Sequence, residues 1–509
     1  MKGWVLSSAL AIASALGGCA VGPDYRPPFL SLPGGFLGQS GQKASPSTGS
    51  PDVDLAQWWR SLHDRELDSL VERALQSNLD LDIALNRLQA ARAQIVVLAN
   101  QALPEGGATA GGGIGTGSDE TKGRATQAMG SAETSSGLEK ISQVGGFDAN
   151  WELDIFGKIR REVEAEGYDV EALKSARDWV FATVAADVAR AYFDMTGLQK
   201  QRAVLMQDIA AAQGSLNLAQ TRFDRGLNNE LDVTLATREL GTLQARVAPL
   251  GAQIEAERAA IAVLLGQYPE SLARELEKSG ALPALPTNIP VGTPAGLLRR
   301  RPDIQEAERR IAAATARIGV ATADLFPTVF LTGAAGAQGG VRASSGTPVT
   351  IIGSLGPGVY WPLLDFGALD AQIEIADLQT RAQLDGYKQT ILTAVRQVDD
   401  ADSSYRAQKQ SLLSLDRALD AAHQATKLAT ERYDRGLTDF LNVLDAERQE
   451  FDLEQRRVVA LQTAADDLVA LYKAVGGGWP PNELIPPIRT PQPAAIAAAR
   501  DLMAPAQGH

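Results

Sequence analysis

The chain contains an internal duplication, in which the same pattern of residues returns 210 positions later. Residues 221–227 read TRFDRGL and residues 431–437 read ERYDRGL, and seven of the thirteen aligned pairs that begin here are identical. The same offset aligns Trp151 with Trp361. Two units are fewer than the three or more that a solenoid needs, so the chain is a twofold duplication of one design.

A second match lies further upstream, where the offset is larger. Residues 91–104 align with residues 314–327 at an offset of 223, and each stretch ends in a proline, Pro104 or Pro327. The change of 13 residues falls before Trp151, where the first unit has the longer loop. Each unit is predicted to hold a helix of about 30 residues, a Gly-rich β-like stretch, a very long helix, a glycine turn and a second long helix.

Each unit has a long stretch without proline, residues 157–224 in the first and residues 367–434 in the second. A continuous helix of ~65 residues is ~100 Å long, far longer than the helices of a compact core. Apolar residues recur at spacings of three and four, which is typical of a coiled coil. An ordinary extended coiled coil would show the same period, so the period alone does not decide the architecture. In the first unit the apolar residues are Leu173, Ala176, Val180, Val184, Val188, Ala191, Met195 and Leu198.

A glycine closes each of the two long helices. Gly226 and Gly436 directly follow Arg225 and Arg435. Glycine readily adopts the left-handed backbone found just past a helix end, and a cation in the last turn interacts favourably with the helix dipole. The repeated Asp-Arg-Gly sequence therefore predicts one tight turn between two long helices in each unit.

The β-like stretches alternate between apolar and polar residues. Phe147, Ala149, Trp151 and Leu153 share one parity, and acidic residues or asparagine fill the positions between them. Residues 349–363 show a similar alternation. One apolar and one wet face is the pattern of a membrane barrel strand.

Strand number then constrains the assembly. Four strands per chain cannot close a barrel, since closure needs about eight or more, so three copies would pool twelve strands. Trp151, Tyr360 and Trp361 fit the aromatic band at a lipid–water boundary, although ordinary core aromatics would give the same sequence. We therefore expect a mostly α-helical protein with a membrane β-barrel shared between chains.

The N-terminus predicts a cleaved and lipid-modified protein. Residues 1–18 read as a signal peptide, in which Lys2 precedes a short apolar run. Residues 16–19 (LGGC) resemble a bacterial lipobox, so the expected modification is a diacylglycerol and an N-acyl chain on Cys19, and Ala20 implies sorting to the outer membrane. Cys19 is the only cysteine and cannot form an internal disulfide. The alternative is a chance cysteine in a signal peptide that is cleaved elsewhere.

Charge and residue types exclude several other functions. A formal net charge of -13 argues against nucleic acid as a partner. The three histidines, His63, His423 and His509, show no metal-site spacing, and no phosphate-binding loop or nucleophile elbow is present. The sequence therefore predicts no enzyme, no metal site and no cofactor beyond the lipid, and function should depend on the shape and charge of a pore.

Several motifs resemble the outer-membrane efflux lipoproteins of the TolC/OprM/NodT type. Residues 298–304 read LRRRPDI, residues 323–327 read ADLFP, the tryptophan pair at 58–59 matches the usual start of the mature fold, and residues 476–479 (GGGW) match its end. The resemblance implies a homotrimeric channel-tunnel, a passive exit duct for small molecules. Its partners would be a periplasmic adaptor (membrane fusion) protein, an inner-membrane pump of the resistance-nodulation-division (RND) class and outer-membrane lipid.

The resemblance also implies where the tunnel closes. Carried over by position, the residues that line the periplasmic aperture are Leu437, Leu441, Asp445 and Arg448. Their spacings of four, four and three put them on one helix face, and a threefold ring of Asp445 would draw cations into the closed mouth. This sequence has Thr438 and Asn442 where some relatives carry a basic and an acidic residue, so a double acidic ring is not implied. The alternative is that Asp445 is a solvated residue paired with Arg448.

Two further sets of residues follow from the same resemblance. Asp232 and Tyr433 match positions that latch the closed state. The turns at Arg225 with Gly226, and at Arg435 with Gly436, would face the adaptor. Two rival functions remain open: a coiled-coil lipoprotein that tethers layers of the envelope, and the same duct used to export metal ions or polypeptides. The tether would not explain four amphipathic strands at equivalent places in a duplication.

The predicted boundaries follow from these observations. Residues 1–18 are the signal peptide, 19–55 an acylated extended segment, 56–280 the first repeat, 293–478 the second repeat and 486–509 a flexible tail. The predicted strands are about 104–118, 143–155, 326–338 and 349–363, and the predicted long helices about 157–225, 229–266, 367–435 and 438–475.

Overall fold

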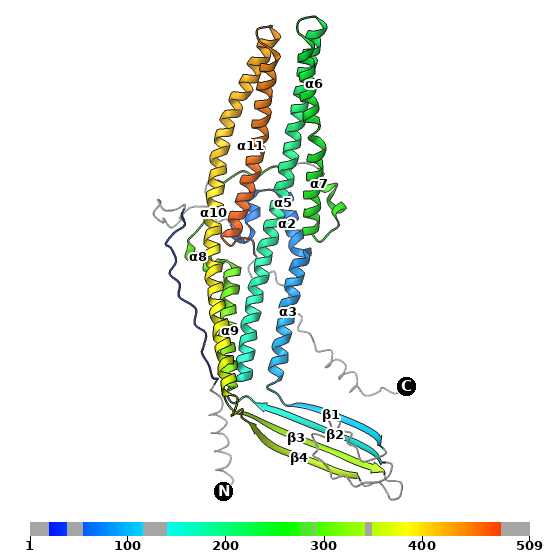
Figure 1. Ribbon diagram of the computed structural model, residues 1–509, viewed down its shortest axis with the longest axis vertical. Helices are drawn as coiled ribbons and strands as arrows, with labels where there is room; N and C mark the ends of the chain where they lie inside the picture. The colour runs from blue at the N-terminus through cyan, green and yellow to red at the C-terminus, as the bar shows by residue number, and fades with distance from the viewer. Residues whose placement is uncertain are drawn as a thin grey trace.

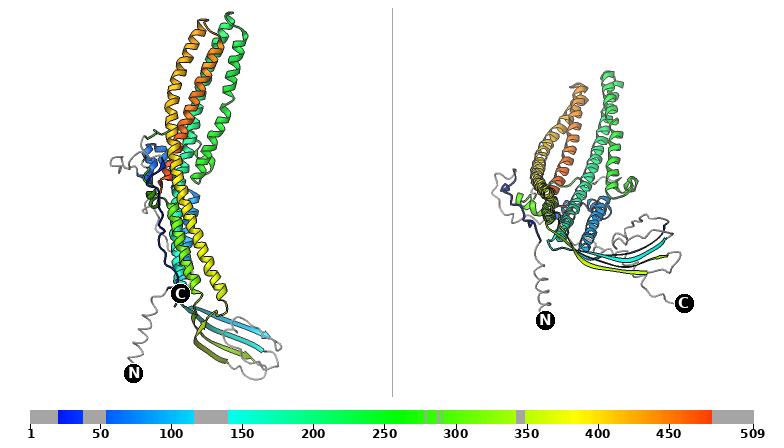
Figure 2. Two further views of the ribbon diagram at one scale, coloured as in Figure 1. Left: turned by 60° about the vertical axis from the view of Figure 1, so that its left-hand side comes forward. Right: turned by 60° about the horizontal axis from the view of Figure 1, so that its bottom comes forward.

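The computed structural model describes most of the chain as a rod of long helices with a small sheet at one end (Figure 1). The described residues are 20–37, 54–115, 140–277, 280–286, 289, 291–341 and 349–479. Cys19, the predicted signal peptide and the predicted tail therefore lie outside the described residues. The sheet and the tips of the helix hairpins lie at opposite ends of the rod (Figures 1 and 2).

Four antiparallel strands form the sheet, in the order β1-β2-β3-β4. They are β1 Glu105–Gly115, β2 Lys140–Leu153, β3 Thr328–Val341 and β4 Val349–Tyr360. The central pair joins the two repeats, with Trp151 opposite Leu331. β1 and β4 are the edges, and neither has a strand on its outer side among the described residues. The strands overlap all four stretches that the sequence predicts.

Apolar side chains of the sheet point to solvent in the single chain. Phe147 is 71% exposed, and Ile351, Leu355 and Val359 are exposed as well. Such side chains are normally covered in the working protein. Residues of the opposite parity on β2, such as Asp148, are polar. The sheet therefore has an uncovered apolar face, which needs a surrounding other than water.

The two tryptophans aligned by the duplication make the same contact. The indole Nε1–H of Trp151 donates to the carbonyl oxygen of Ala102 at 2.9 Å, and that of Trp361 donates to Leu325 at 3.1 Å. Each bond ties the end of one strand to the turn that precedes the other strand of its repeat. The conserved offset in the sequence thus corresponds to an equivalent junction between helices and sheet.

Two helices run from the sheet to the far end of the rod (Figure 1). They are α5 (Lys158–Asp224, 67 residues) and α10 (Phe366–Asp434, 69 residues). The shorter α3 (Leu79–Asn100) packs beside α5, and α9 (Pro302–Ala323) packs against both α5 and α10. Among the described residues, no helix combines the length and apolar character required to cross a membrane.

The return leg of the first hairpin corrects one prediction. The sequence predicts a single helix over 229–266, whereas the structure has α6 (Glu230–Gln244) followed by α7 (Val247–Leu264). Pro249 is the third residue of α7. Its ring would clash with the carbonyl group four residues earlier in a continuous helix, but proline is accepted in a first turn. The second hairpin has Val459 at the aligned position, and its return leg, α11 (Phe440–Ala474), is continuous.

The helices of about 30 residues predicted before each β-like stretch are also divided. α2 (Arg65–Ser77) ends at Asn78, whose side chain accepts hydrogen bonds from the first backbone amides of α3. In the second repeat, α8 (Pro294–Arg300) ends before Pro302, which begins α9. An Asx cap and a proline both mark the start of a new helix, so each predicted helix is divided in two.

Arg301 explains the LRRRPDI motif in structural terms. The side chain is only 1% exposed. Its guanidinium donates to the carbonyl oxygen of Ala474 at 2.9 Å and to Gln397 at 2.9 Å, and it pairs with Asp303 at 2.7 Å. It also lies 4.9 Å from the ring centre of Trp179. A buried arginine needs such partners, so the motif joins the helices at the middle of the rod.

The N-terminal segment 20–37 is extended and lies along the helices (dark blue in Figure 1). Near its start, Arg161 of α5 donates to the carbonyl oxygen of Val21 at 3.1 Å and pairs with Asp24 at 2.8 Å. At its other end, the amide of Leu37 donates to Asp399 of α10 at 2.8 Å. The segment therefore spans from the sheet junction to the middle of the rod.

Candidate functional site at the tips of the two helix hairpins

The first hairpin (α5 with α6 and α7) and the second hairpin (α10 with α11) end in equivalent turns. Gly226 and Gly436 adopt φ values of +70° and +72°. The amide of Leu227 donates to Arg222 O, and that of Leu437 donates to Arg432 O, both at 2.9 Å. This bond between residues five apart is the Schellman helix end, for which glycine is preferred. The predicted glycine turns are present in both repeats.

The predicted adaptor-facing residues lie at the outermost point of the rod. Arg225 and Arg435 are the C-cap residues between each long helix and its glycine, and both are exposed, as are Gly226 and Gly436. A Cβ atom at Gly226 would meet no other atom within 4 Å. The glycine is therefore required by the backbone conformation and not by crowding, and the surface of this turn is open to a partner.

Below the turns, the two hairpins are joined by a hydrogen-bond triad, here called the latch, of Asn228, Asp232 and Tyr433. The hydroxyl group of Tyr433 donates to Asp232 Oδ2 at 3.1 Å. The side-chain amide of Asn228 donates to the same oxygen at 3.2 Å and to the Tyr433 hydroxyl oxygen at 3.0 Å. The structure thus brings together Asp232 and Tyr433, which lie 201 residues apart.

Arg222 reinforces this junction from the first hairpin. Its guanidinium lies 4.7 Å from the ring centre of Tyr433, and it donates to the carbonyl oxygen of Asp434 at 2.8 Å. Cation–π contacts contribute ~0.5–2 kcal/mol, more when water is excluded. Tyr433 is only 2% exposed and packs against Phe440 and Val443. Burial raises the pKa of the Tyr433 hydroxyl, as does the nearby Asp232 carboxylate, so this group stays protonated and can donate.

The four predicted aperture residues do not all share one environment. Leu437 and Leu441 are 62% and 57% exposed, and Asp445 is exposed as well. No described residue forms an ion pair with Asp445. Two large leucines exposed on one helix face are unusual on the surface of an assembled protein. This face is therefore free to contact other chains or to line a pore.

Arg448 instead bonds across to the first hairpin. Its Nε–H donates to Glu239 Oε2 of α6 at 2.6 Å, and a second guanidinium nitrogen contacts the same oxygen. Glu239 is buried, so this is a partly desolvated ion pair. The pairing of Arg448 with Asp445, considered as an alternative from the sequence, is therefore not the one present. Glu239 lies seven residues after Asp232 on α6, so this pair joins the two hairpins about two turns further from the tip than the latch.

Sequence reasoning missed three residues of this site, Asn228, Arg222 and Glu239. Arg222 could have been suspected, because it belongs to the repeated segment that includes Arg432. Asn228 and Glu239 could not, because the aligned residues are Thr438 and Gln449 and no local motif marks them. Their partners lie about 200 residues away in the chain, and only the folded structure shows the contacts.

Several buried carboxyl groups lie further along the hairpins. Burial raises the pKa of Asp208 on α5 to about 7, and the neighbouring Glu454 carboxylate adds to the rise. Burial likewise raises the pKa of Asp466 on α11 to about 8, together with the nearby Asp194 carboxylate. Glu447 is buried and accepts a hydrogen bond from Ser215. Asp208 and Asp466 therefore titrate near neutral pH.

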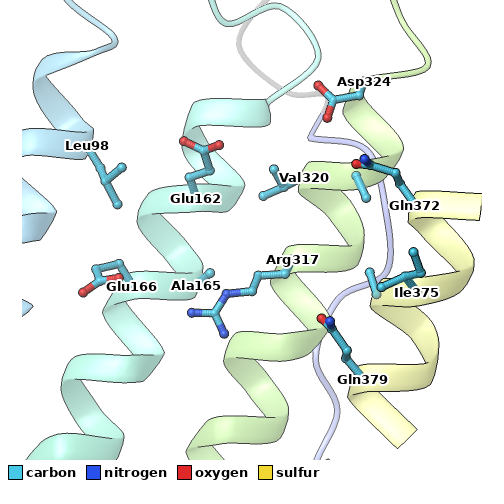
Figure 3. Close-up of a pocket in the computed structure, with 12 residues that line it drawn as sticks. Leu98, Glu162, Ala165, Glu166, Arg317, Val320, Asp324, Gln372, Ile375 and Gln379 are labelled. Atoms are coloured by element: carbon cyan, nitrogen blue, oxygen red, sulfur yellow. The ribbon is translucent and has the colours of Figure 1, made fainter. Parts of the chain in front are cut away.

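A groove with a volume of about 510 Å³ lies at the other end of the rod, near the sheet. Figure 3 shows Glu162 and Glu166 of α5 and Arg317 of α9 among the side chains that line this groove. Burial raises the pKa of both glutamates. The described lining residues include no serine, cysteine or histidine, so the groove offers no nucleophile with a base beside it. Its lining residues come from α3, α5, α9 with its C-cap residue Asp324, and α10.

Comparison with known proteins identifies the family. The sequence profile of the outer membrane efflux proteins matches residues 70–267 and 294–477, one match for each repeat. The chain belongs to this family. It is 31% identical over 492 residues to nodulation protein T of Rhizobium leguminosarum bv. viciae, covering 95% of both chains.

Two further comparisons extend the assignment of this outer membrane efflux protein. The toluene efflux pump outer membrane protein TtgC of Pseudomonas putida is 30% identical, over 93% of this chain and 96% of the relative. The solved structure of the outer-membrane channel OprN superposes with a TM-score of 0.79 at 35% identity, over 91% of this chain and 100% of that chain. The predicted family, the mostly α-helical channel fold and the function as an outer-membrane efflux channel are confirmed.

Proposed function

We propose that this outer membrane efflux protein works as a homotrimer, anchored by lipid on Cys19, that serves as the passive exit duct of a tripartite pump for small molecules. A periplasmic adaptor would dock on the hairpin tips, and an inner-membrane pump of the RND class would supply the energy. The assignment to the family carries the channel function.

The observation that carries the trimer is the open sheet. β1 and β4 each present an edge with no further strand among the described residues, and the apolar side chains of β4 are exposed. An unpaired edge cannot remain open in lipid, because each free backbone group costs several kcal/mol there. Pairing β1 of one chain with β4 of the next removes every edge, and three chains reach the number of strands that closure needs.

The anchor is supported by the position of the first described residue. Ala20 lies against Gly157, where an added Cβ would come within 2.7 Å of the Ala20 Cα atom. The amide of Val21 donates to Phe156 O at 3.2 Å. Residue 20 is thus held at the junction of sheet and helices, and acyl chains on the preceding residue, Cys19, would start at the level where the sheet begins.

The gate is supported by the contacts between the hairpins. The latch and the Arg448–Glu239 pair hold the second hairpin against the first within one chain. Leu437, Leu441 and Asp445 lie near these contacts, on an exposed face of the second hairpin. Three copies of this face around an axis would form apolar and acidic rings, and opening would require the contacts between hairpins to break.

Two equivalent turns per chain support docking of the adaptor at the tips. The turns at Gly226 and Gly436 have the same backbone conformation and the same outward arginine, Arg225 or Arg435. A trimer would therefore present six similar tips. An adaptor with one binding mode could then engage both repeats, which would explain why the turn sequence is the best preserved part of the duplication.

Conductance of the purified protein in a planar bilayer tests this function. We expect trimers that resist dissociation on a denaturing gel, a low conductance with cation preference, and loss of that preference in Asp445→Ala. The matched control is Asp439→Ala, which lies at the start of the same helix outside the aperture set. A water-soluble monomer that inserts no channel would overturn the proposal in favour of a coiled-coil tether. Unchanged selectivity in Asp445→Ala would overturn the acidic ring alone.

A further inference from the structure

Three metal-ligating side chains converge between the two helices of the second hairpin. His423 lies on α10, and Glu450 and Glu454 lie on α11. The imidazole Nδ1 of His423 contacts Glu450 Oε1, and its Nε2 lies 3.8 Å from Glu454 Oε1. One ligand atom from each of the three residues can be chosen so that all lie within 4.8 Å of one another. These residues are here called the histidine–glutamate cluster.

The helices position the cluster in a defined way. Glu450 and Glu454 are four residues apart, so both carboxylates lie on the face of α11 that looks toward α10. Their side chains are only 16% and 22% exposed, whereas that of His423 is 47% exposed. The two acids are therefore held by packing, and the imidazole is open enough to adjust and to admit an ion from solvent.

A fourth group, buried and incompletely bonded, lies beside the cluster. Asp208 of α5 is 2% exposed, and its Oδ2 has no hydrogen-bond partner among the described residues. It interacts directly with Glu454 and electrostatically with Glu450. Leaving a buried carboxylate oxygen unbonded beside two further acids is costly. A bound cation would neutralise this concentration of negative charge.

The duplication shows that the fold itself does not require the cluster. At the offset of 210, the first hairpin has Gln213, Leu240 and Gln244 in place of His423, Glu450 and Glu454. The first hairpin therefore packs the same pair of helices without any of the three ligands.

We propose that His423, Glu450 and Glu454 form a binding site for a borderline divalent transition-metal ion, with Zn²⁺ as the reference ion. An imidazole ligand disfavours Mg²⁺ and Ca²⁺, which take oxygen ligands, and the lack of a thiolate disfavours Cu(I). Three protein ligands with a fourth position open to water is a common zinc arrangement. Tetrahedral bonds of ~2.0–2.1 Å put ligand atoms ~3.3 Å apart. Ligand atoms that now lie up to 4.8 Å apart must therefore approach one another by up to roughly 1.5 Å.

The first test is Zn²⁺ binding by calorimetry to the full chain in detergent, prepared without a polyhistidine tag and stripped of metal by a chelator. The chain has only three histidines, so background binding is low. We expect one Zn²⁺ per chain, and binding at least tenfold weaker in His423→Gln and in Glu454→Gln, since even outer partners of a metal site change affinity ~10- to 100-fold. These substitutions copy the residues of the first hairpin, and circular dichroism checks that each variant keeps its helices.

The matched control is Asp452→Asn, which removes an acid from the same turns of α11 on the opposite, exposed face. It should bind Zn²⁺ like the parent. Co²⁺ gives an independent readout, because imidazole coordination produces visible absorption bands that His423→Gln should abolish. The proposal is overturned if the parent shows no saturable Zn²⁺ binding, if both variants bind as tightly as the parent, or if excess Mg²⁺ displaces the ion. The test does not depend on whether the channel conducts.

Discussion

The two hairpins of this outer membrane efflux protein share their tips and differ in their return legs. Both tips use a glycine at φ of about +70° and the same bond between residues five apart. The first return leg is interrupted between α6 and α7 ahead of Pro249, whereas the second, with Val459 at the aligned position, runs unbroken as α11. Backbone geometry at the tip has therefore been kept through the duplication, while the leg behind it has diverged.

The ionisable residues of the two hairpins have also diverged. The second return leg carries Asp466 where the first has Ala256, and it contributes two members of the histidine–glutamate cluster. At these aligned positions the second repeat carries ionisable residues where the first carries uncharged ones. The exposed leucines near the tip are present in both hairpins, Leu227 and Leu231 in the first and Leu437 and Leu441 in the second.

The largest effect should come from making the two legs alike. Val459→Pro places a proline in the interior of α11, where it removes a hydrogen bond and clashes with the preceding turn, at a cost of ~3 kcal/mol or more. Urea unfolding followed by circular dichroism measures this change. The reciprocal Pro249→Val should change stability by less than ~1 kcal/mol, because α7 already starts there. An equal loss in the free energy of unfolding from Val459→Pro and Pro249→Val would contradict the explanation that Pro249 separates α6 from α7.

Asp466 gives the second hairpin a pH-dependent group at a position where the first hairpin has Ala256. Its pKa is raised to about 8, so the folded state binds this proton more tightly than the unfolded state, in which the pKa is near 3.8. The free energy of unfolding should therefore fall as pH rises from ~4 to ~8. Asp466→Asn should stabilise the protein by ~1–3 kcal/mol at pH 9 and leave it unchanged at pH 5. A gain of the same size at both pH values would rule out titration of Asp466 as the cause.

Breaking the latch should loosen one hairpin from the other. Tyr433→Phe removes the donor to Asp232 and the acceptor for Asn228, with an expected loss of ~1–2 kcal/mol. Because the contact joins the two hairpins, the bilayer conductance should rise at the same time. The control is Tyr268→Phe, since Tyr268 is 85% exposed. Lower stability with unchanged conductance would show that the contact is structural and does not gate the channel.

The smallest changes in stability are expected for the two tip glycines, and these changes should be equal in the two hairpins. Gly226→Ala and Gly436→Ala each force a side chain into the left-handed region, at ~1 kcal/mol. Gly214→Ala, at a helical position of α5 with open space around it, should instead stabilise by up to ~1 kcal/mol. Melting curves of the three variants measure the comparison. Clearly different destabilisation by Gly226→Ala and Gly436→Ala would show that the two glycines have different surroundings despite their similar backbone conformation.

Periodicity and glycine turns were enough to predict the long helices and the four strands, because these features are written in local sequence. The breaks at Asn78 and Pro302 and ahead of Pro249 were also local, and attention to caps and prolines would have found them. The contacts between hairpins were not predictable in this way. Asn228 and Glu239 have no motif, and the histidine–glutamate cluster joins residues 27 positions apart on two helices whose register the sequence does not state.

The extended N-terminal segment has a consequence for how the protein is built. It is synthesised first, yet its contacts are with Arg161 in the first repeat and Asp399 in the second. That binding surface forms only when both repeats have come together. The segment that is synthesised first should therefore be the last to bind. The segment that follows the proposed lipid anchor would thus also report that both repeats have folded together.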